Sequence, residues 1–94
     1  MIEIPAALLP LLEQARASAA KRRVSIALVG GSVRDLLLGR APHDLDFAVL
    51  GDAVGLARAA ANALGGAFYV MDAARGTARV IVDGVIVDFA RCRG

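Results

Sequence analysis

Residues 29–47 read VGGSVRDLLLGRAPHDLDF. This stretch closes one strand-like run, turns through Gly30 and Gly31, and continues into a short helix-like run. Asp44 and Asp46 then stand one residue apart at the beginning of another strand-like run. A glycine pair before a helix suits an anion, because free N–H groups can approach the anion there. The stretch therefore places an anion-binding turn close in sequence to two carboxylates.

Apolar periodicity predicts the elements on either side of this stretch. The dipeptide Asp83-Gly84 is a strong signal for a two-residue hairpin between the last two strand-like runs. The predicted helices cover residues 6–21, 32–39 and 53–64, and the predicted strands cover 24–30, 44–50, 67–71, 77–83 and 85–92. The order helix-strand-helix-strand-helix, followed by three strands, predicts an α/β fold with a mixed sheet and a terminal hairpin.

The chain has 94 residues, which fits one domain. We expect an N-terminal helix within residues 1–23 and a compact core over residues 24–94. The predicted last strand reaches the end of the sequence without a closing element, so we expect an interrupted domain. Hydrophobic residues make up 57% of the chain, which predicts apolar surface covered by further protein, for example by a second copy of the chain.

Two features of the composition bear on location. The N-terminus lacks the basic segment of a secretory signal, and no apolar run approaches the ~20 residues that span a bilayer. The single cysteine, Cys92, cannot form an internal disulfide, which fits a reducing compartment. The sequence therefore predicts a cytoplasmic protein that does not enter a membrane.

Arginine dominates the basic residues: ten of the eleven are Arg, and the formal net charge is +2. The planar guanidinium can hold a phosphate through two hydrogen bonds, so this bias favours nucleotide or RNA partners. A GC-rich coding sequence would produce the same bias, and composition alone leaves both explanations open.

The acidic pair predicts a cation site. Side chains alternate along a strand, so Asp44 and Asp46 point to one face, roughly 6–7 Å apart. They repel each other unless a cation lies between them, and carboxylate oxygens suit Mg²⁺ or Mn²⁺. The alternative is an exposed strand start with no ligand, because an isolated D-x-D pattern is common.

Asp88 interrupts the apolar run VIVDFA in the second strand of the predicted hairpin. A carboxylate there needs a partner or a function. If this strand lies beside residues 44–50, Asp88 completes a cluster of three carboxylates, which is what two-metal phosphoryl transfer requires. The structural alternative is a strand-edge Asp that reaches solvent or pairs with Arg91 or Arg93.

The segment Gly30-Gly31-Ser32 has two interpretations. The glycines allow phosphates to approach the backbone, while the Ser32 hydroxyl either caps the helix or contacts a phosphate oxygen. The pattern is neither G-x-G-x-x-G nor a Walker loop, and a glycine pair by itself is more often an ordinary turn.

Three other polar residues flank these motifs. Arg34 is a candidate for contact with a nucleotide, and Asp35 either orients an Arg, caps the helix or forms an internal ion pair. His43 has no second His as a partner, which argues against zinc, and we interpret it as a turn residue.

The combination of GGSVRDLLLGR, P-x-DLDF and a downstream VDFARCRG resembles the head domain of class II tRNA nucleotidyltransferases and bacterial poly(A) polymerases. These enzymes belong to the polymerase-β-like nucleotidyltransferase superfamily. The resemblance covers residues from about 24 to 94, and the segment RGTARV resembles the family's strand before its third carboxylate. It implies a polymerase-β-like core and attack by a tRNA or RNA 3′-hydroxyl on the α-phosphate of CTP or ATP.

The resemblance also implies roles for individual residues. Two Mg²⁺ or Mn²⁺ ions would be bound by the three matching carboxylates, and the nucleoside triphosphate by the glycine motif and its neighbours. The residues that match are Asp44, Asp46 and Asp88 for the metals, and Gly30, Gly31, Ser32, Arg34, Asp35 and Arg93 for the nucleotide.

The sequence departs from the family after the third carboxylate. The family's neck, which selects the base, and its tRNA-binding domains would follow Gly94, so we expect this chain to be either a fragment of a longer protein or a deliberately shortened one. We therefore expect Mg-NTP binding with weak or no activity, and the sequence does not indicate whether the parent adds CCA, CC, A or poly(A). A competing hypothesis is a non-catalytic nucleotide- or protein-binding module that associates with itself.

Overall fold

A computed structural model of the chain describes residues 4–92. It has three helices and five strands in the order α1 (Leu9–Arg22), β1 (Ser25–Val29), α2 (Gly31–Leu37), β2 (Asp44–Leu50), α3 (Ala53–Leu64), β3 (Ala67–Asp72), β4 (Thr77–Val82) and β5 (Val85–Arg91). The five strands form one sheet in the order β1-β2-β5-β4-β3. Strands β2 and β5 are parallel and the other neighbours are antiparallel, so the predicted mixed sheet is confirmed.

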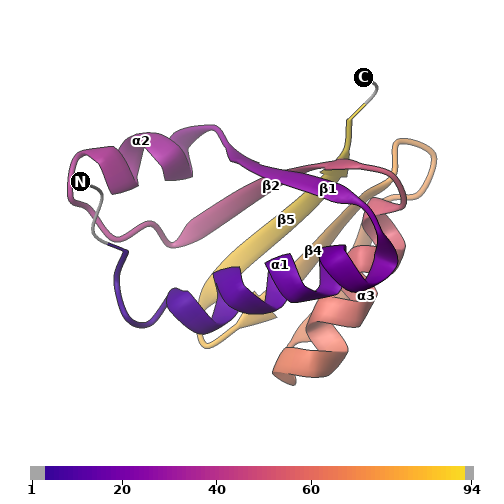
Figure 1. The fold of residues 1–94 in the computed structure, drawn as a ribbon, viewed down its shortest axis with the longest axis horizontal. Helices are drawn as coiled ribbons and strands as arrows, with labels where there is room; N and C mark the ends of the chain where they lie inside the picture. The colour runs from indigo at the N-terminus through magenta and orange to yellow at the C-terminus, as the bar shows by residue number, and fades with distance from the viewer. Residues whose placement is uncertain (1–3, 93–94) are drawn as a thin grey trace.

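Helices α1 and α3 pack together against one face of this sheet (Figure 1). Their apolar positions recur every three or four residues, which turns one face of each helix toward the strands. The shared core consists of Leu8, Leu11, Ala15, Ala19, Leu36, Leu45, Phe47, Val49, Ala53, Leu56, Ala57, Ala60, Ala61, Ala78, Val80, Val82, Val87 and Phe89. Helix α1 thus contributes to the same core as the sheet, and α2, which lies at one end of β1 and β2 (Figure 1), adds Leu36 to it.

Helix α1 begins at Leu9, three residues after the predicted start. Residues 6–8 form a turn instead, in which the Leu8 amide donates to the Pro5 carbonyl at 2.9 Å. Pro10 explains the difference, because proline has no N–H to donate and is tolerated only in the first turn of a helix. The helix ends at Arg22, and Arg23 at its C-cap adopts a left-handed conformation with φ of 59°.

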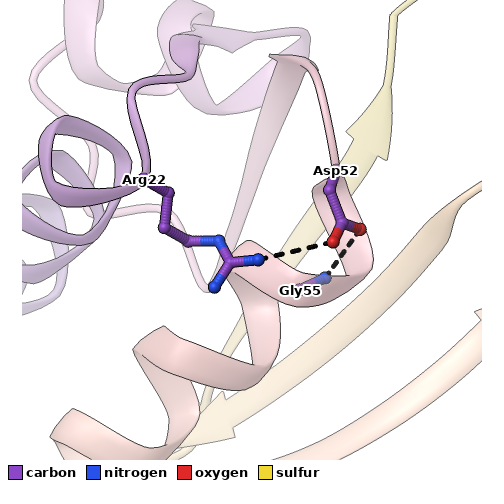
Figure 2. Close-up of polar contacts among 3 residues, drawn as sticks. All are labelled: Arg22, Asp52 and Gly55. Carbon is purple, nitrogen blue, oxygen red and sulfur yellow. Dashed lines mark hydrogen bonds and ion pairs between the residues drawn. The ribbon is translucent and has the colours of Figure 1, made fainter.

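The first turn of α3 is joined to the end of α1 by a small polar cluster (Figure 2). Asp52 caps α3 by accepting a hydrogen bond from the Gly55 amide at 2.9 Å, and Arg22 contacts the other oxygen of Asp52 at 3.4 Å. A side chain at position 55 would meet both groups, so the glycine leaves room for the cap and the ion pair together. The cluster fixes where α3 begins after β2.

The predicted hairpin between β4 and β5 is confirmed. Asp83 and Gly84 have φ of 50° and 78°, as a two-residue turn of this kind requires. Val82 therefore faces Val85, and every earlier residue of β4 faces a fixed residue of β5. Within residues 4–92 no helix has the length and apolar character needed to cross a membrane.

Candidate active site

The three predicted carboxylates lie on one face of the sheet. Strands β2 and β5 run side by side (Figure 1), and Asp46 is the register partner of Asp88. Aligned residues of neighbouring strands point to the same face, with backbones about 4.8 Å apart. Asp44 is two residues before Asp46 and points the same way, while Leu45 and Phe47 point into the core under the helices. Asp44, Asp46 and Asp88 thus share the face turned away from α1 and α3.

Asp46 and Asp88 belong to a row of register partners that crosses the whole sheet. The row consists of Val29, Asp46, Asp88, Arg79 and Tyr69, one from each strand in the order of the sheet. Two acidic groups and one basic group are therefore adjacent in the middle of the row, between apolar or aromatic side chains at its ends.

Arg79 holds Asp88 through two hydrogen bonds. The guanidinium Nε donates to Oδ1 at 2.8 Å and Nη2 donates to Oδ2 at 3.1 Å. The sequence suggested Arg91 or Arg93 as a structural partner of Asp88, and Arg79 takes the place of Arg91 because it faces Asp88 across the hairpin. Arg93 lies outside the described residues. The signal for Arg79 was present in the sequence, since a two-residue turn at Asp83-Gly84 pairs position 79 with position 88.

The carboxylates repel one another in this arrangement. Partial burial raises the pKa of Asp46 above its ordinary value of 3.8, and the negative charges of Asp88 and Asp44 raise it further, while Arg79 opposes the increase. The hydrogen bonds from Arg79 to Asp88 raise the pKa of Arg79, so the guanidinium stays charged. The site carries more negative than positive charge and favours an additional cation.

The glycine turn adjoins Asp46. Gly30 has φ of 75° and ψ of −149°, a conformation that is essentially restricted to glycine. A Cβ atom at Gly30 would lie 3.5 Å from Oδ2 of Asp46, so the bare backbone stands next to this carboxylate. The glycine turn therefore lies beside Asp46, one member of the acidic pair.

Ser32 does not cap the helix as one alternative expected. Gly30 occupies the N-cap position, and Ser32 lies one residue inside α2. Its buried hydroxyl donates to the Val29 carbonyl at 2.9 Å. This bond ties the first turn of α2 to the end of β1. Ser32 is not the cap because the helix begins at Gly31, one residue earlier than predicted.

The other candidate residues surround this turn. Arg34 is exposed in the first turns of α2, with Nη2 3.5 Å from the position that a Cβ atom would take at Gly31. Asp35 is half-buried, and no side chain of residues 4–92 forms an ion pair with it. His43 is exposed, and its carbonyl accepts a hydrogen bond from Ile86 at 2.9 Å. Arg34 is thus the exposed basic side chain nearest the glycine pair in sequence.

The donor set fits a hard divalent ion in its chemistry, since three carboxylates of like charge share a solvent-facing surface. As the side chains stand, no three His, Cys, Asp or Glu residues in the described part of the chain converge on one point. Two surface pockets lie away from the three carboxylates, and the larger of the two, of about 680 Å³, is lined by Asp52, Arg91 and Cys92 among others. The three carboxylates therefore lie on an open face of the sheet, outside both of these pockets.

Comparison with known proteins places these features in a family. Residues 26–94 match the family model described as the poly A polymerase head domain. A CC-adding tRNA nucleotidyltransferase of Thermus thermophilus is 47% identical over 66 residues, which are 70% of this chain and 15% of the relative. An A-adding tRNA nucleotidyltransferase of Halalkalibacterium halodurans is 47% identical over 58 residues, which are 62% of this chain and 14% of the relative.

A solved structure supports the same assignment. The complex of a CCA-adding enzyme with ATP is 31% identical, covers 96% of this chain and 22% of its own, and superposes with a TM-score of 0.88. The predicted fold and the resemblance to tRNA nucleotidyltransferase heads are thus confirmed, although the chain spans only about 15% of the curated relatives it matches. The chain belongs to the poly A polymerase head-domain family.

Proposed function

We propose that this chain is the metal- and triphosphate-binding core of a tRNA nucleotidyltransferase. The observation that carries the proposal is the register of β2 and β5, which sets Asp46 beside Asp88 on the face that also bears Asp44. The tRNA nucleotidyltransferases among the relatives support the same class of reaction and substrate. Action on tRNA also supports a cytoplasmic location.

The proposed reaction transfers a nucleoside monophosphate from CTP or ATP to a tRNA 3′-hydroxyl. The hydroxyl oxygen forms a bond to the α-phosphorus and loses its proton, while the bond from that phosphorus to the bridging oxygen breaks and pyrophosphate leaves. Two bound Mg²⁺ or Mn²⁺ ions would stabilise the attacking and leaving oxygens. Asp44, Asp46 and Asp88 would hold these ions, because their oxygens share one face of the sheet.

The glycine turn is proposed to receive the triphosphate. Gly30 lies against Asp46 without a side chain of its own, so phosphate oxygens could reach both the backbone and a cation at that carboxylate. Gly31 would contribute a backbone amide, and the exposed Arg34 would contribute a positive charge. Asp35 would support this turn from the same helix. Ser32 would act through its bond to Val29, which holds the turn in place.

The choice of base is not assigned to this chain. A CC-adding and an A-adding relative both match it at 47% identity, so this core does not distinguish the two activities. We therefore propose that CTP and ATP bind with similar affinity, and that the 94-residue chain alone transfers nucleotides weakly or not at all.

A titration followed by NMR tests this proposal. Mg²⁺ and ATP are expected to shift the backbone amides of Asp44, Asp46 and Gly30, and Mn²⁺ to broaden them. Asp46→Asn should remove the metal response, whereas Asp83→Asn, at an exposed turn that accepts Asn equally well, should keep it. Unchanged spectra at saturating millimolar Mg²⁺ and ATP would reject the proposal.

One observation favours a second candidate, a binding module that does not catalyse. Both oxygens of Asp88 are already hydrogen-bonded to Arg79, so this carboxylate could serve the sheet alone. In that case ATP would bind without a requirement for Mg²⁺, and Asp46→Asn would leave binding unchanged. Self-association of the chain stays a prediction, which sedimentation tests.

A further inference from the structure

Arg79 is the feature of the site that the proposed reaction does not use. Within residues 4–92 it is the one basic side chain paired with any of the three carboxylates. It comes from β4, on the far side of β5 from Asp46, and its contact with Asp88 is made by two nitrogens at 2.8 and 3.1 Å. A planar fork against a planar carboxylate is the strongest form of this contact and fixes the orientation of both groups.

The contact is also partly removed from water. The side chains of Arg79 and Asp88 are 34% and 26% exposed, whereas the three other ion pairs of the described residues are more exposed. A half-buried carboxylate beside two like charges is unfavourable without a cation. In the metal-free chain Arg79 supplies that cation.

The same contact occupies the atoms that a metal would use. An ionised carboxylate offers about four lone-pair positions, and a bidentate guanidinium takes the two that face it. A divalent ion shared with Asp46 must approach the Asp88 oxygens from the neighbouring strand, so it competes with Arg79 for their orientation and for their charge. Removal of the guanidinium would expose three carboxylates to the ion.

We propose that Arg79 is a placeholder cation for the third carboxylate. It holds Asp88 on the active face in the metal-free protein and releases at least one of its two hydrogen bonds when a divalent ion binds at Asp46 and Asp88. The inference rests on the proposed function, because it requires a metal at these carboxylates. Arg79 acts through Asp88 and is a positioning residue.

Arg79→Gln separates this role from a structural one. Loss of one charge close to a divalent ion should tighten Mn²⁺ binding roughly three- to tenfold at low salt, an effect that salt reduces. The metal-free variant should melt at a lower temperature than the wild type, but Mn²⁺ should raise its melting temperature by more. A purely structural Arg79 would lower the melting temperature and leave the Mn²⁺ affinity unchanged.

Two comparisons control for general effects of charge. Arg22→Gln also removes one arginine from an ion pair with an aspartate, near the other end of β2, and should leave Mn²⁺ affinity within about twofold of the wild type. In an Asp88→Asn background, Arg79→Gln should change the affinity less than it does alone, because the contested oxygens are gone. Arg79→Lys should fall between wild type and Arg79→Gln.

The Nε–H group of Arg79 gives a direct readout that needs no activity. Its NMR signal should reflect the hydrogen bond to Asp88 in the metal-free chain and should move as Mg²⁺ saturates the site. A signal that stays fixed while Asp46 responds would overturn the placeholder role and leave the proposed function intact, and so would weaker Mn²⁺ binding by Arg79→Gln. If neither protein binds Mn²⁺, both proposals are overturned.

Discussion

Asp46 and Asp88 face the same side of the sheet as register partners, yet among residues 4–92 only Asp88 is hydrogen-bonded to a cationic side chain. Arg79 reaches Asp88 from the next strand, and within residues 4–92 no side chain or amide donates to Asp46. The two carboxylates therefore differ in electrostatic state although their backbone positions are equivalent. Asp46 is the member of the pair that has no direct cationic partner among residues 4–92, and the charge of Arg79 offsets its repulsion only in part.

This difference predicts an effect of pH on stability. The pKa of Asp46 is higher in the folded chain than its ordinary value of 3.8, which applies to the unfolded chain. Protonation of Asp46 therefore favours the folded chain. Its contribution is therefore lost as pH rises from below 3.8 through its raised folded pKa. The free energy of unfolding of Asp46→Asn should therefore rise relative to that of the wild type between about pH 3 and about pH 7.

Urea unfolding at a series of pH values measures this effect. Asp83→Asn is the matched control, because Asp83 is exposed in the hairpin turn and its variant should follow the pH profile of the wild type. Parallel profiles for Asp46→Asn and the wild type would contradict the assigned repulsion among the carboxylates.

The polar cluster at α3 predicts a separation of cap and ion pair. Asp52→Ala removes both, and should lower the free energy of unfolding by about 1–2 kcal/mol, most of it from the cap. Asp52→Asn keeps a good capping group and loses only an exposed ion pair at 3.4 Å, so it should cost about 0.3 kcal/mol. Thermal unfolding of the two variants decides, and equal losses would mean that the ion pair with Arg22 dominates.

Local chemistry in the sequence accounts for most of the fold. The glycines and the Asp83-Gly84 turn mark where elements end, so the predicted elements agree with the observed ones to within a few residues. The alternation in DLDFAVL predicts that Asp44 and Asp46 share a face, because the alternate residues Leu45, Phe47 and Val49 are apolar and enter the core. Pro10 indicated that α1 begins close to residue 9, although the apolar period at residues 6–8 suggested an earlier start.

The sequence could predict that the three carboxylates meet only on the condition that the strand of Asp88 lies beside residues 44–50. Asp46 and Asp88 are far apart in sequence, and their pairing depends on two parallel strands whose neighbours are decided by the packing of α1 and α3. Arg79 was missed for another reason: it precedes the hairpin turn, and only the register of the hairpin brings it to Asp88. Arg91 is nearer to Asp88 in sequence but lies beside Gly76, where its amide donates to the carbonyl of that residue.

The aromatic pair beneath the carboxylates predicts a link between the core and the site. Phe47 and Phe89 are register partners whose rings stack at 5.4 Å, one residue beyond Asp46 and Asp88. Phe89→Leu should lower the free energy of unfolding by about 1–2 kcal/mol, because it removes the stack and part of the buried area. Urea unfolding measures the loss.

The control for this variant is Phe68→Leu, which alters a half-buried ring on β3, away from the carboxylates and near Arg58 of α3. Both variants should be destabilised, but only Phe89→Leu should also weaken Mn²⁺ binding, because it loosens the register that holds Asp46 beside Asp88. Equal Mn²⁺ affinities would show that the backbone hydrogen bonds fix that register without the rings.

The glycine pair predicts opposite results from the same substitution at adjacent positions. Gly30→Ala forces a side chain into φ of 75° and ψ of −149°, and should lower the free energy of unfolding by about 1–3 kcal/mol. Gly31 lies inside α2 with no such constraint, and its Cβ would meet only Nη2 of Arg34 at 3.5 Å, an ordinary contact. Gly31→Ala should therefore leave stability unchanged or raise it by about 0.5 kcal/mol.

Binding of Mg²⁺-ATP should separate the two variants further. The methyl group of Gly30→Ala would stand 3.5 Å from Oδ2 of Asp46, where the proposed triphosphate meets its cation, so binding should weaken even at temperatures where the variant is folded. Gly31→Ala adds its methyl group beside Arg34 and should bind within a few-fold of the wild type. Calorimetric titration of both variants measures this affinity. A larger loss of affinity for Gly31→Ala would indicate that the triphosphate binds on the side of α2 that bears Arg34 and not at Gly30.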